Sequence, residues 1–238
     1  MHHGDVSASA DPTPQSEVRS TSGPARRRTY HHGDLRHALL EAGLELAVEG
    51  GPDAVVLREA TRRVGVSANA AYRHFADRDA LLGDVASLAQ GKMADVIAGV
   101  IAGVPDQGSP GATARARFRA VGIGYLRFAL GQPGLFRTGF TVPTDLSRAF
   151  APESRGQCGH TPFELLANLL DEMLAAGVLP AEQREGAELL AWSAVHGMAM
   201  LALDGPLRDL PPESFDELTL RLVTMVDLGL GVRDPASA

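Results

Sequence analysis

The chain has 238 residues and a formal net charge of −7, with 45% hydrophobic and 5% aromatic residues. A chain of this length and hydrophobic content can build one large or two small cores, so a purely disordered tail is excluded. Ala, Leu, Gly and Arg dominate, and β-branched residues other than Val are few, which favours helices over strands. We therefore predict a globular, all-α protein.

The single cysteine, Cys158, excludes a framework of intrachain disulfides. We find no uncharged apolar stretch that approaches the roughly 20 residues needed to span a bilayer. The N-terminal residues also lack the charged-then-apolar pattern of a signal peptide. We expect a protein of the reducing cytoplasm that does not contact a membrane.

Residues 1–25 are rich in Ser, Pro, Ala and Thr and have no apolar periodicity, which predicts a disordered tail. Positive charge gathers in residues 26–78, where nine arginines against seven carboxylates give a net charge of +2. Residues 79–238 have 12 basic and 19 acidic side chains, a net charge of −7. The middle block could meet a polyanion while the remainder is repelled, although a solvated surface of mixed charge explains the same counts.

The first predicted helix begins at Asp34, where apolar residues start to recur at spacings of three and four. Asp34 is a plausible N-cap, and Gly50-Gly51-Pro52 should end this helix. A second helix is predicted over Leu57–Val64, and a third over about Ala68–Phe75. Three helices are therefore expected before about residue 75.

The turn between the second and third predicted helices reads Gly65-Val66-Ser67. Gly65 can adopt the left-handed conformation that ends one helix, and Ser67 can cap the next. This spacing is that of a helix-turn-helix, which projects its second helix into a DNA major groove. Taken alone the pattern is weak, because many αα-hairpins look alike and bind nothing.

The third predicted helix combines small residues with a polar cluster. The small side chains permit close approach, Asn69 can read adenine edges, and Arg73 can read guanine or grip phosphate. Tyr72, His74 and Arg78 are of the type that hold phosphates and fix register. The predicted DNA-binding residues are Arg58, Ser67, Ala68, Asn69, Ala70, Tyr72, Arg73, His74 and Arg78.

A longer helix should follow Asp77, which can cap it, and continue to about Val100. A break at Pro105 to Pro110 then opens the second half of the chain. Further helices are predicted at about 112–131, 133–139, 162–176, 181–203 and 213–230, with a polar loop at 141–161.

Residues 26–82, RRRTYHHGDLRHALLEAGLELAVEGGPDAVVLREATRRVGVSANAAYRHFADRDALL, resemble the DNA-binding domain of the TetR family of bacterial regulators. The Tyr-x-His-Phe element at 72–75, followed by a basic residue at Arg78, carries the resemblance. Farther along, Trp192-Ser-Ala-Val-His196-Gly197 resembles the Trp-His-Gly element of one C-terminal subclass, which Gln132-Pro-Gly-Leu-Phe136 also suits.

The resemblance implies an all-helical homodimer that binds a palindromic operator. Residues 26–78 would form the three-helix DNA-binding domain, and residues 79–238 a larger helical domain for ligand binding and dimerisation. A ligand would shift the separation of the two DNA-binding domains and release the DNA. By position, the family's phosphate contacts match Tyr72, His74 and Arg78, and its recognition-helix positions match Ala68, Asn69, Ala70 and Arg73.

Four residues differ from the family pattern, and three of these differences should affect packing or capping. Thr61 and Val64 stand where Ala is usual, and they should add bulk at a tight helix crossing. Val56 stands where a capping Ser or Thr is common, which should remove a cap worth about 0.5–2 kcal/mol. Arg78 in place of the usual Lys keeps the charge and the phosphate role.

The last two predicted helices carry apolar residues at helical spacing, which we interpret as the dimer face; internal core is the alternative. Small residues there, Ala199 among them, would let helices approach closely. The proposed face contains Leu189, Leu190, Ala194, Gly197, Leu201, Leu218, Leu222, Met225 and Leu228.

The ligand cavity is harder to place, because aromatic residues at helical spacing are more often core than lining. His196 lies one turn from Trp192 on the same helix face, either as a ligand contact or as a structural histidine. The candidate ligand-binding residues are Tyr125, Phe128, Phe136, Phe140, Phe163, Trp192 and His196.

The sequence thus predicts a ligand-responsive repressor whose partners are double-stranded operator DNA, an unknown small-molecule effector and a second copy of the chain. We expect no cofactor and no metal, because Cys158 and His160 make only two ligands. An enzyme that uses His196 or Cys158 is disfavoured, because we find no Gly-rich phosphate loop or nucleophile elbow. An orphan small-molecule binder of the same fold remains the alternative.

Overall fold

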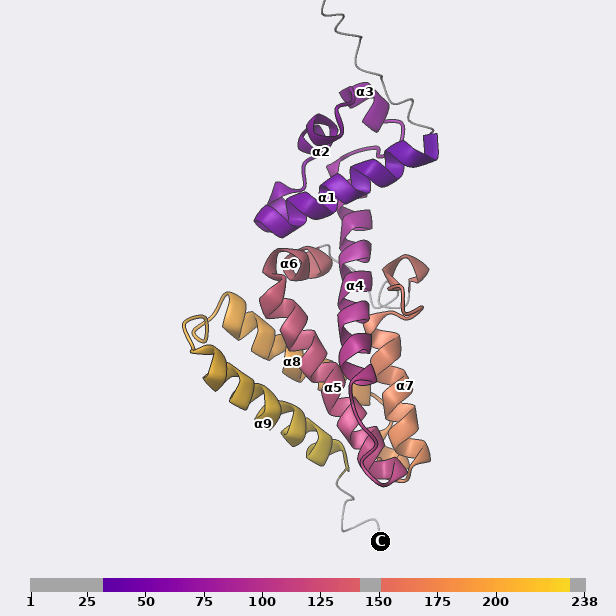
Figure 1. Ribbon diagram of the computed structural model, residues 1–238, viewed down its shortest axis with the longest axis vertical. Coiled ribbons are helices and arrows are strands. Elements are labelled where there is room, and N and C mark those ends of the chain that lie inside the picture. The colour runs from indigo at the N-terminus through magenta and orange to yellow at the C-terminus, as the bar shows by residue number, and fades with distance from the viewer. Residues whose placement is uncertain (1–31, 142–150, 232–238) are drawn as a thin grey trace, which may run out of the picture.

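The computed structural model describes residues 32–141 and 151–231, and within these ranges every regular element is a helix (Figure 1). This confirms the all-α prediction. The predicted tail at 1–25 lies outside the described residues. The helices are α1 (His32–Ala54), α2 (Leu57–Val64), α3 (Ala68–Ala71), α4 (Arg78–Ala102), α5 (Pro110–Gly131), α6 (Pro133–Thr141), α7 (Pro162–Ala175), α8 (Ala187–Leu203) and α9 (Pro212–Gly231), with 3₁₀ turns η2 (Pro152–Ser154) and η3 (Ala181–Gln183).

Helices α1–α3 pack together at one end of the molecule, and α4 runs from them into the larger C-terminal part (Figure 1). At 1.5 Å per residue, the 25 residues of α4 extend about 37 Å. Helix α4 is long and apolar enough to cross a membrane by length and composition alone, although it contains charged residues. Eleven of its residues are buried, however, and it packs against α1, α5, α6 and α7, so it is a core helix.

Local capping signals in α2, α3 and α4 were predicted correctly. Gly65 ends α2 in the left-handed conformation, with φ at 74°. The Ser67 side chain accepts a hydrogen bond from the N–H of Ala70, and the Asp77 side chain accepts one from the N–H of Ala80. The Val56 side chain makes no cap bond for α2, as expected.

Several helix boundaries differ from the prediction. Helix α1 starts at His32 rather than at Asp34, and at Gly51, where φ is 68°, it kinks and continues for another turn. The third helix is regular only to Ala71, because Phe75 and His74 both donate to the Ala71 carbonyl in a tighter turn. The helix predicted over 181–203 is interrupted at Gly186, whose left-handed backbone separates η3 from α8.

Helix α6 joins the two parts of the molecule, because it packs against both α1 and α4. A Cβ atom at Gly134 would collide with the backbone carbonyl of Ala47 on α1, so only glycine allows this approach. At the other end of α6, Gln90 of α4 donates a 2.8 Å hydrogen bond to the Gly139 carbonyl. The position of α1 is therefore set by a backbone-to-backbone contact with α6.

A buried ion network holds α9 on α5. Asp227 is fully buried, and its two oxygens accept from Arg115 at 2.8 Å and from Arg119 at 3.0 Å. Arg115 also donates to the carbonyl of Val178, at 3.1 Å. Burial raises the pKa of the Asp227 carboxyl, and the two guanidinium groups oppose this by favouring the charged form. The periodicity of the sequence did not predict that the charge of Asp227 would be buried.

Replacing Asp227 by alanine should lower the free energy of unfolding by about 3–5 kcal/mol, because two arginines would lose their buried partner. The control is Asp171→Ala, which removes an exposed carboxylate that pairs with Arg184 and should cost less than about 1 kcal/mol. Denaturant unfolding of the two variants measures the difference. Equal losses would show that the Asp227 network does not stabilise the fold.

Candidate nucleic-acid interface and ligand cavity

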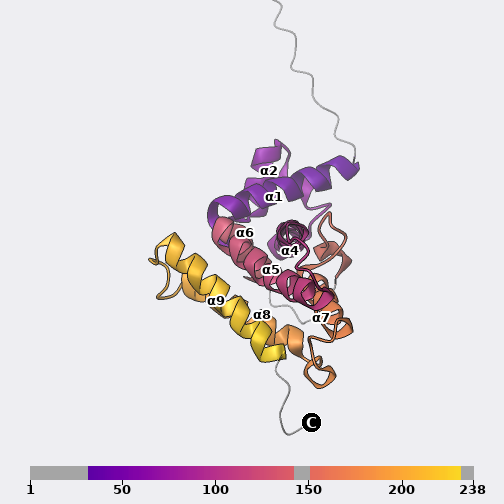
Figure 2. The ribbon, with the colours of Figure 1, turned by 60° about the horizontal axis from the view of Figure 1, so that its bottom comes forward.

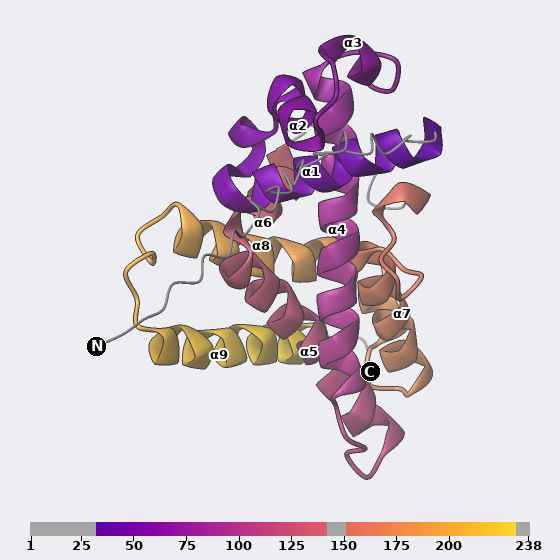
Figure 3. The ribbon, with the colours of Figure 1, turned by 45° about the horizontal axis from the view of Figure 1, so that its top comes forward.

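Helices α2 and α3 lie at the end of the molecule farthest from α9 (Figure 3), and the predicted DNA contacts lie on the surface of this pair and at the start of α4. Ala71 and Phe75 anchor it, since both are buried in the core of α1–α4. The predicted contacts fall into two groups. Arg58, Ser67, Ala68, Asn69, Tyr72 and Arg73 are exposed, whereas Ala70, His74 and Arg78 are partly buried.

The arginines around this surface differ in what they bind. Arg62 pairs with Glu59 on its own helix, and Arg63 pairs with Glu49 of α1. For Arg58 and Arg73, by contrast, no ion pair is recorded within the described residues. Two exposed guanidinium groups therefore remain available on the face that the sequence predicted to contact DNA.

Arg78 has a structural role that the sequence did not reveal. Its Nε donates to the carbonyl of Val55 at 3.0 Å, and its Nη2 donates to the carbonyl of Pro52 at 2.7 Å. These carbonyls lie where α1 ends and α2 begins, so Arg78 closes that turn from the start of α4. A phosphate contact by Arg78 stays a prediction, and it would have to be made beside these two bonds.

The two bulky departures from the family pattern are accommodated locally. Thr61 is buried, and its hydroxyl donates to the carbonyl of Arg58 at 2.7 Å, so no polar group is left unpaired. Val64 is partly buried and packs against the core.

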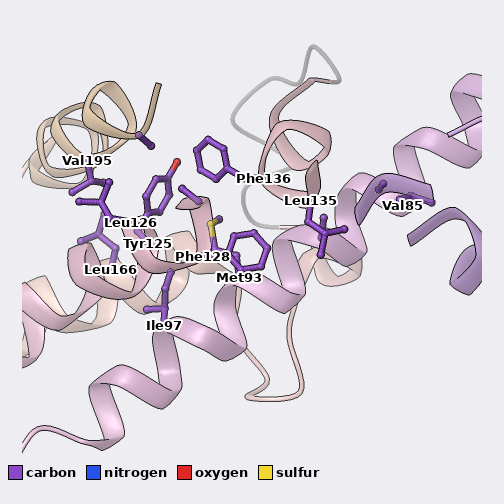
Figure 4. Close-up of a cluster of buried hydrophobic side chains, with 14 of the residues drawn as sticks. Val85, Met93, Ile97, Tyr125, Leu126, Phe128, Leu135, Phe136, Leu166 and Val195 are labelled. Carbon is purple, nitrogen blue, oxygen red and sulfur yellow. The ribbon is translucent and has the colours of Figure 1, made fainter. Parts of the chain in front are cut away.

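A cavity of about 310 Å³ lies inside the C-terminal part. Sixteen residues from α4 to α9 line it, and none of them is charged. Figure 4 shows Met93, Ile97, Tyr125, Leu166 and Val195 of this wall converging from four helices. Ligand sites in proteins are commonly preformed apolar cavities of this kind.

The structure divides the seven candidate ligand-binding residues. The cavity wall includes Tyr125, Phe140, Phe163 and Trp192. Phe128 and Phe136 are instead buried in the surrounding core. His196 is not part of the wall, but its ring contacts the hydroxyl of the wall residue Tyr125. The wall residue Gln90 was missed, because nothing in the sequence distinguishes it from other polar residues of α4.

A chain of hydrogen bonds crosses the cavity wall. Trp192 Nε1 donates to the Tyr125 oxygen at 3.2 Å, and the Tyr125 oxygen lies 2.8 Å from His196 Nδ1. Burial lowers the pKa of the His196 imidazole and raises the pKa of the Tyr125 phenol, so both groups are neutral at pH 7. Phe140 packs edge-on beside these hydrogen bonds, with its ring centroid 5.0 Å from that of His196.

Helices α8 and α9 lie next to one another, and both pack against α5 (Figures 1 and 2). Their outer faces carry large exposed apolar side chains, and Gly197 and Gly229 have open space above them. Ala199, expected on this face, is fully buried, because it lies on the inner side of α8. Leu218 and Leu222 are half-buried. The exposed apolar residues are Leu189, Leu190, Met200, Leu201, Leu220, Met225 and Leu228.

Cys158 and His160 form a local turn. The Cys158 N–H donates to Asp95 at 2.9 Å, and the His160 ring lies 3.1 Å from the Cys158 carbonyl oxygen. Burial raises the pKa of the Cys158 thiol, which disfavours the reactive thiolate. In the part of the chain that the structure describes, no three His, Cys, Asp or Glu side chains gather as metal ligands would.

Comparison with known families decides the class of the protein. Residues 39–85 match the family described as bacterial regulatory proteins, tetR family, and residues 118–226 match the tetracyclin repressor-like C-terminal domain. The chain joins a TetR-family helix-turn-helix domain to a TetR-like C-terminal domain. No curated protein matches this TetR-type chain.

Solved structures share the fold. A protein of unknown function from Rhodococcus sp. RHA1 is 28% identical, with a TM-score of 0.66 over 86% of this chain and 100% of that one. A TetR variant from Acinetobacter baumannii AYE, in complex with minocycline, is 17% identical, with a TM-score of 0.54 over 80% and 93%. RolR in complex with resorcinol is also 17% identical, with a TM-score of 0.56 over 85% and 95%.

Restoring the missing cap at the start of α2 should stabilise the TetR-type DNA-binding domain. Val56→Thr places a hydroxyl near the N–H groups of the first turn, with Glu59 at the third position, and should add about 0.5–2 kcal/mol to the free energy of unfolding. Thermal and denaturant unfolding measure the gain, and Val56→Ala, which adds no acceptor, is the control. If Val56→Thr and Val56→Ala behave alike, the cap is not what α2 lacks.

Proposed function

We propose that this TetR-type protein is a sequence-specific transcriptional regulator, most simply a repressor that a small molecule releases from a palindromic operator. The observation that carries the proposal is the α2–α3 surface. It presents Asn69, Tyr72 and two arginines without recorded ion pairs, in a chain whose formal net charge is −7. Such a local concentration of donors in an acidic protein suits a polyanion.

In the proposed complex, α3 enters the major groove. Asn69 would read an adenine edge, and Arg73 a guanine edge or a phosphate. Tyr72, His74 and Arg78, with Arg58 beside them, would hold phosphates. Ser67, Ala68 and Ala70 would leave room for the backbone of α3 to approach the bases.

A homodimer is proposed through α8 and α9. The exposed leucines and methionines on these two helices form an apolar surface that a monomer would leave in water. Gly197 and Gly229 would let the helices of a partner approach closely. An isologous pair of such faces gives the two-fold symmetry that a palindromic operator needs.

The cavity is the proposed effector site. Phe140 of its wall belongs to α6, and α6 rests on α1 through Gly134. A ligand that moves Phe140 would therefore push on the DNA-binding domain. Two proteins of this fold hold minocycline and resorcinol, which supports a ligand site at the level of the fold.

Further assignments are proposals of the same kind. We assign residues 26–78 to the DNA-binding domain and residues 79–238 to the ligand-binding and dimerisation domain. We also propose that the protein is cytoplasmic. The Trp-His-Gly subclass is supported by the hydrogen bonds that join Trp192 and His196 to Tyr125. An enzymatic role for His196 is disfavoured, because its ring serves this buried chain.

The DNA-binding role predicts a large effect of Arg73→Ala. Its guanidinium is exposed and has no ion pair recorded among the described residues, so affinity for DNA that flanks the protein's own gene should fall about tenfold to a hundredfold without loss of stability. Fluorescence anisotropy at several salt concentrations measures it, together with the melting temperature. The affinity of the unmodified protein should also fall steeply with salt.

Arg208→Ala is the matched control, because Arg208 is an exposed arginine that follows α8, far from α3. It should leave DNA affinity unchanged. Weak binding by the unmodified protein that is equal on flanking and unrelated DNA would contradict the proposal. The orphan small-molecule binder would then be the better account.

The dimer proposal predicts that Leu190→Glu combined with Met225→Glu yields a monomer. Both side chains are more than 60% exposed, so the fold itself should tolerate the change while the interface acquires unpaired charges. Analytical ultracentrifugation measures the state, and Val48→Glu, at an exposed site on α1, is the control. A double variant that stays dimeric would place the interface elsewhere.

A further inference from the structure

The cavity wall restricts the chemistry of its ligand. We propose that the effector is an uncharged, largely apolar molecule that offers hydrogen-bond donors, such as hydroxyl or N–H groups, to Tyr125 and Gln90. This inference rests on the proposed function in one respect, namely that the cavity is the effector site.

The size and polarity of the wall set the body of the ligand. An apolar cavity of about 150 Å³ holds one benzene ring, and this cavity, at about 310 Å³, has room for about twice that volume. Its lining is aromatic and aliphatic apart from Gln90, the Tyr125 hydroxyl and the Trp192 N–H. A compact body of about two fused rings, or an aliphatic body of equal size, fits this space.

The Gln90 side-chain amide has an orientation that leaves its oxygen as an acceptor. Its Nε2 donates to the Gly139 carbonyl at 2.8 Å, and a carbonyl can only accept. The orientation of the amide is therefore fixed, and Oε1 is its free end. No hydrogen bond to this oxygen is recorded among the residues that the structure describes. Gln90 thus presents an acceptor to the cavity.

Tyr125 also presents an acceptor. The Trp192 N–H can only donate, so the phenol oxygen accepts that bond. The phenol proton then needs an acceptor, since a buried hydroxyl without one is costly, and His196 Nδ1 lies 2.8 Å away. The hydroxyl therefore donates to Nδ1, and the neutral imidazole carries its proton on Nε2. One lone pair of the Tyr125 oxygen is left.

The wall holds no charged group, which discriminates against charged ligands. A carboxylate or phosphate would lose its hydration and find no cation in the wall, and the second N–H of Gln90 Nε2 would not replace that hydration. A cation would meet the rings of Phe140, Phe163 and Trp192, but it would find no carboxylate there. Cation–π attraction alone does not replace the lost hydration. A neutral donor is the group that both free acceptors satisfy.

Four naphthalene probes of equal ring size test the inference on the full chain, by isothermal titration calorimetry without DNA. 2-Naphthol is a neutral donor, 2-methoxynaphthalene lacks the donor, 2-naphthoate is an anion and 2-naphthylmethylammonium is a cation. We expect 2-naphthol to bind at least tenfold more tightly than either ion. Equal or tighter binding of an ion, or no detectable binding of 2-naphthol, would overturn the inference.

Tyr125→Phe tests the donor preference itself. The ratio of the 2-naphthol affinity to the 2-methoxynaphthalene affinity should fall by roughly threefold to tenfold, because the phenol oxygen is removed and the Trp192 N–H is freed to donate to the ether. Tyr72→Phe makes the same chemical change on the α3 surface and should leave the ratio unchanged. An identical ratio in the unmodified protein and in Tyr125→Phe would contradict the assignment.

Gln90→Met gives a second test if Tyr125→Phe does not fold, and it too should lower the ratio. Adding 2-naphthol to the protein–DNA complex separates this inference from the proposed function. Selective binding of 2-naphthol without any change in DNA affinity would leave the ligand class standing and contradict the effector role. If the protein does not prefer 2-naphthol over the ionic probes, the proposed ligand class is wrong, whether or not 2-naphthol changes the affinity for DNA.

Discussion

The rest of the structure depends on the contact between α6 and α1. At Gly134 the backbone of α6 lies against the carbonyl of Ala47, with no space for a side chain between them. Because backbones cannot rearrange as side chains do, a displacement of α6 must be passed to α1 or must break the contact. Helix α4, which packs against both α1 and α6, limits the directions in which such a displacement can occur.

The interior of the C-terminal part contains two kinds of polar group, which differ in whether their hydrogen-bonding capacity is used within the protein. Asp227 and its arginines form a closed network, in which each buried charge has a partner and α9 is fixed on α5. Tyr125 and Gln90, in contrast, each keep one acceptor without a recorded partner in the described residues, and both face a cavity. The first arrangement stabilises the fold, and the second leaves hydrogen-bonding capacity for a ligand.

Local features of this fold were predictable from the sequence, and tertiary ones were not. Helix α2, the Gly65 turn and the Asp77 cap follow from residues a few positions apart, so periodicity and capping rules found them. The bonds of Arg78 to two carbonyls more than 20 residues away required the packed structure. For the cavity, spacing identified aromatic residues but not which helix face is hollow, so Phe136 was included although it lies in the core.

Selection from a random-sequence DNA library, with the full-length protein, tests the central claim most directly, because it does not depend on knowing where the operator lies. A homodimer that reads DNA through two copies of α3 should enrich an inverted repeat, with half-sites about one helical turn, or a multiple of it, apart. Enrichment of no motif, or of a motif without two-fold symmetry, would contradict the account of this protein as a dimeric operator-binding regulator.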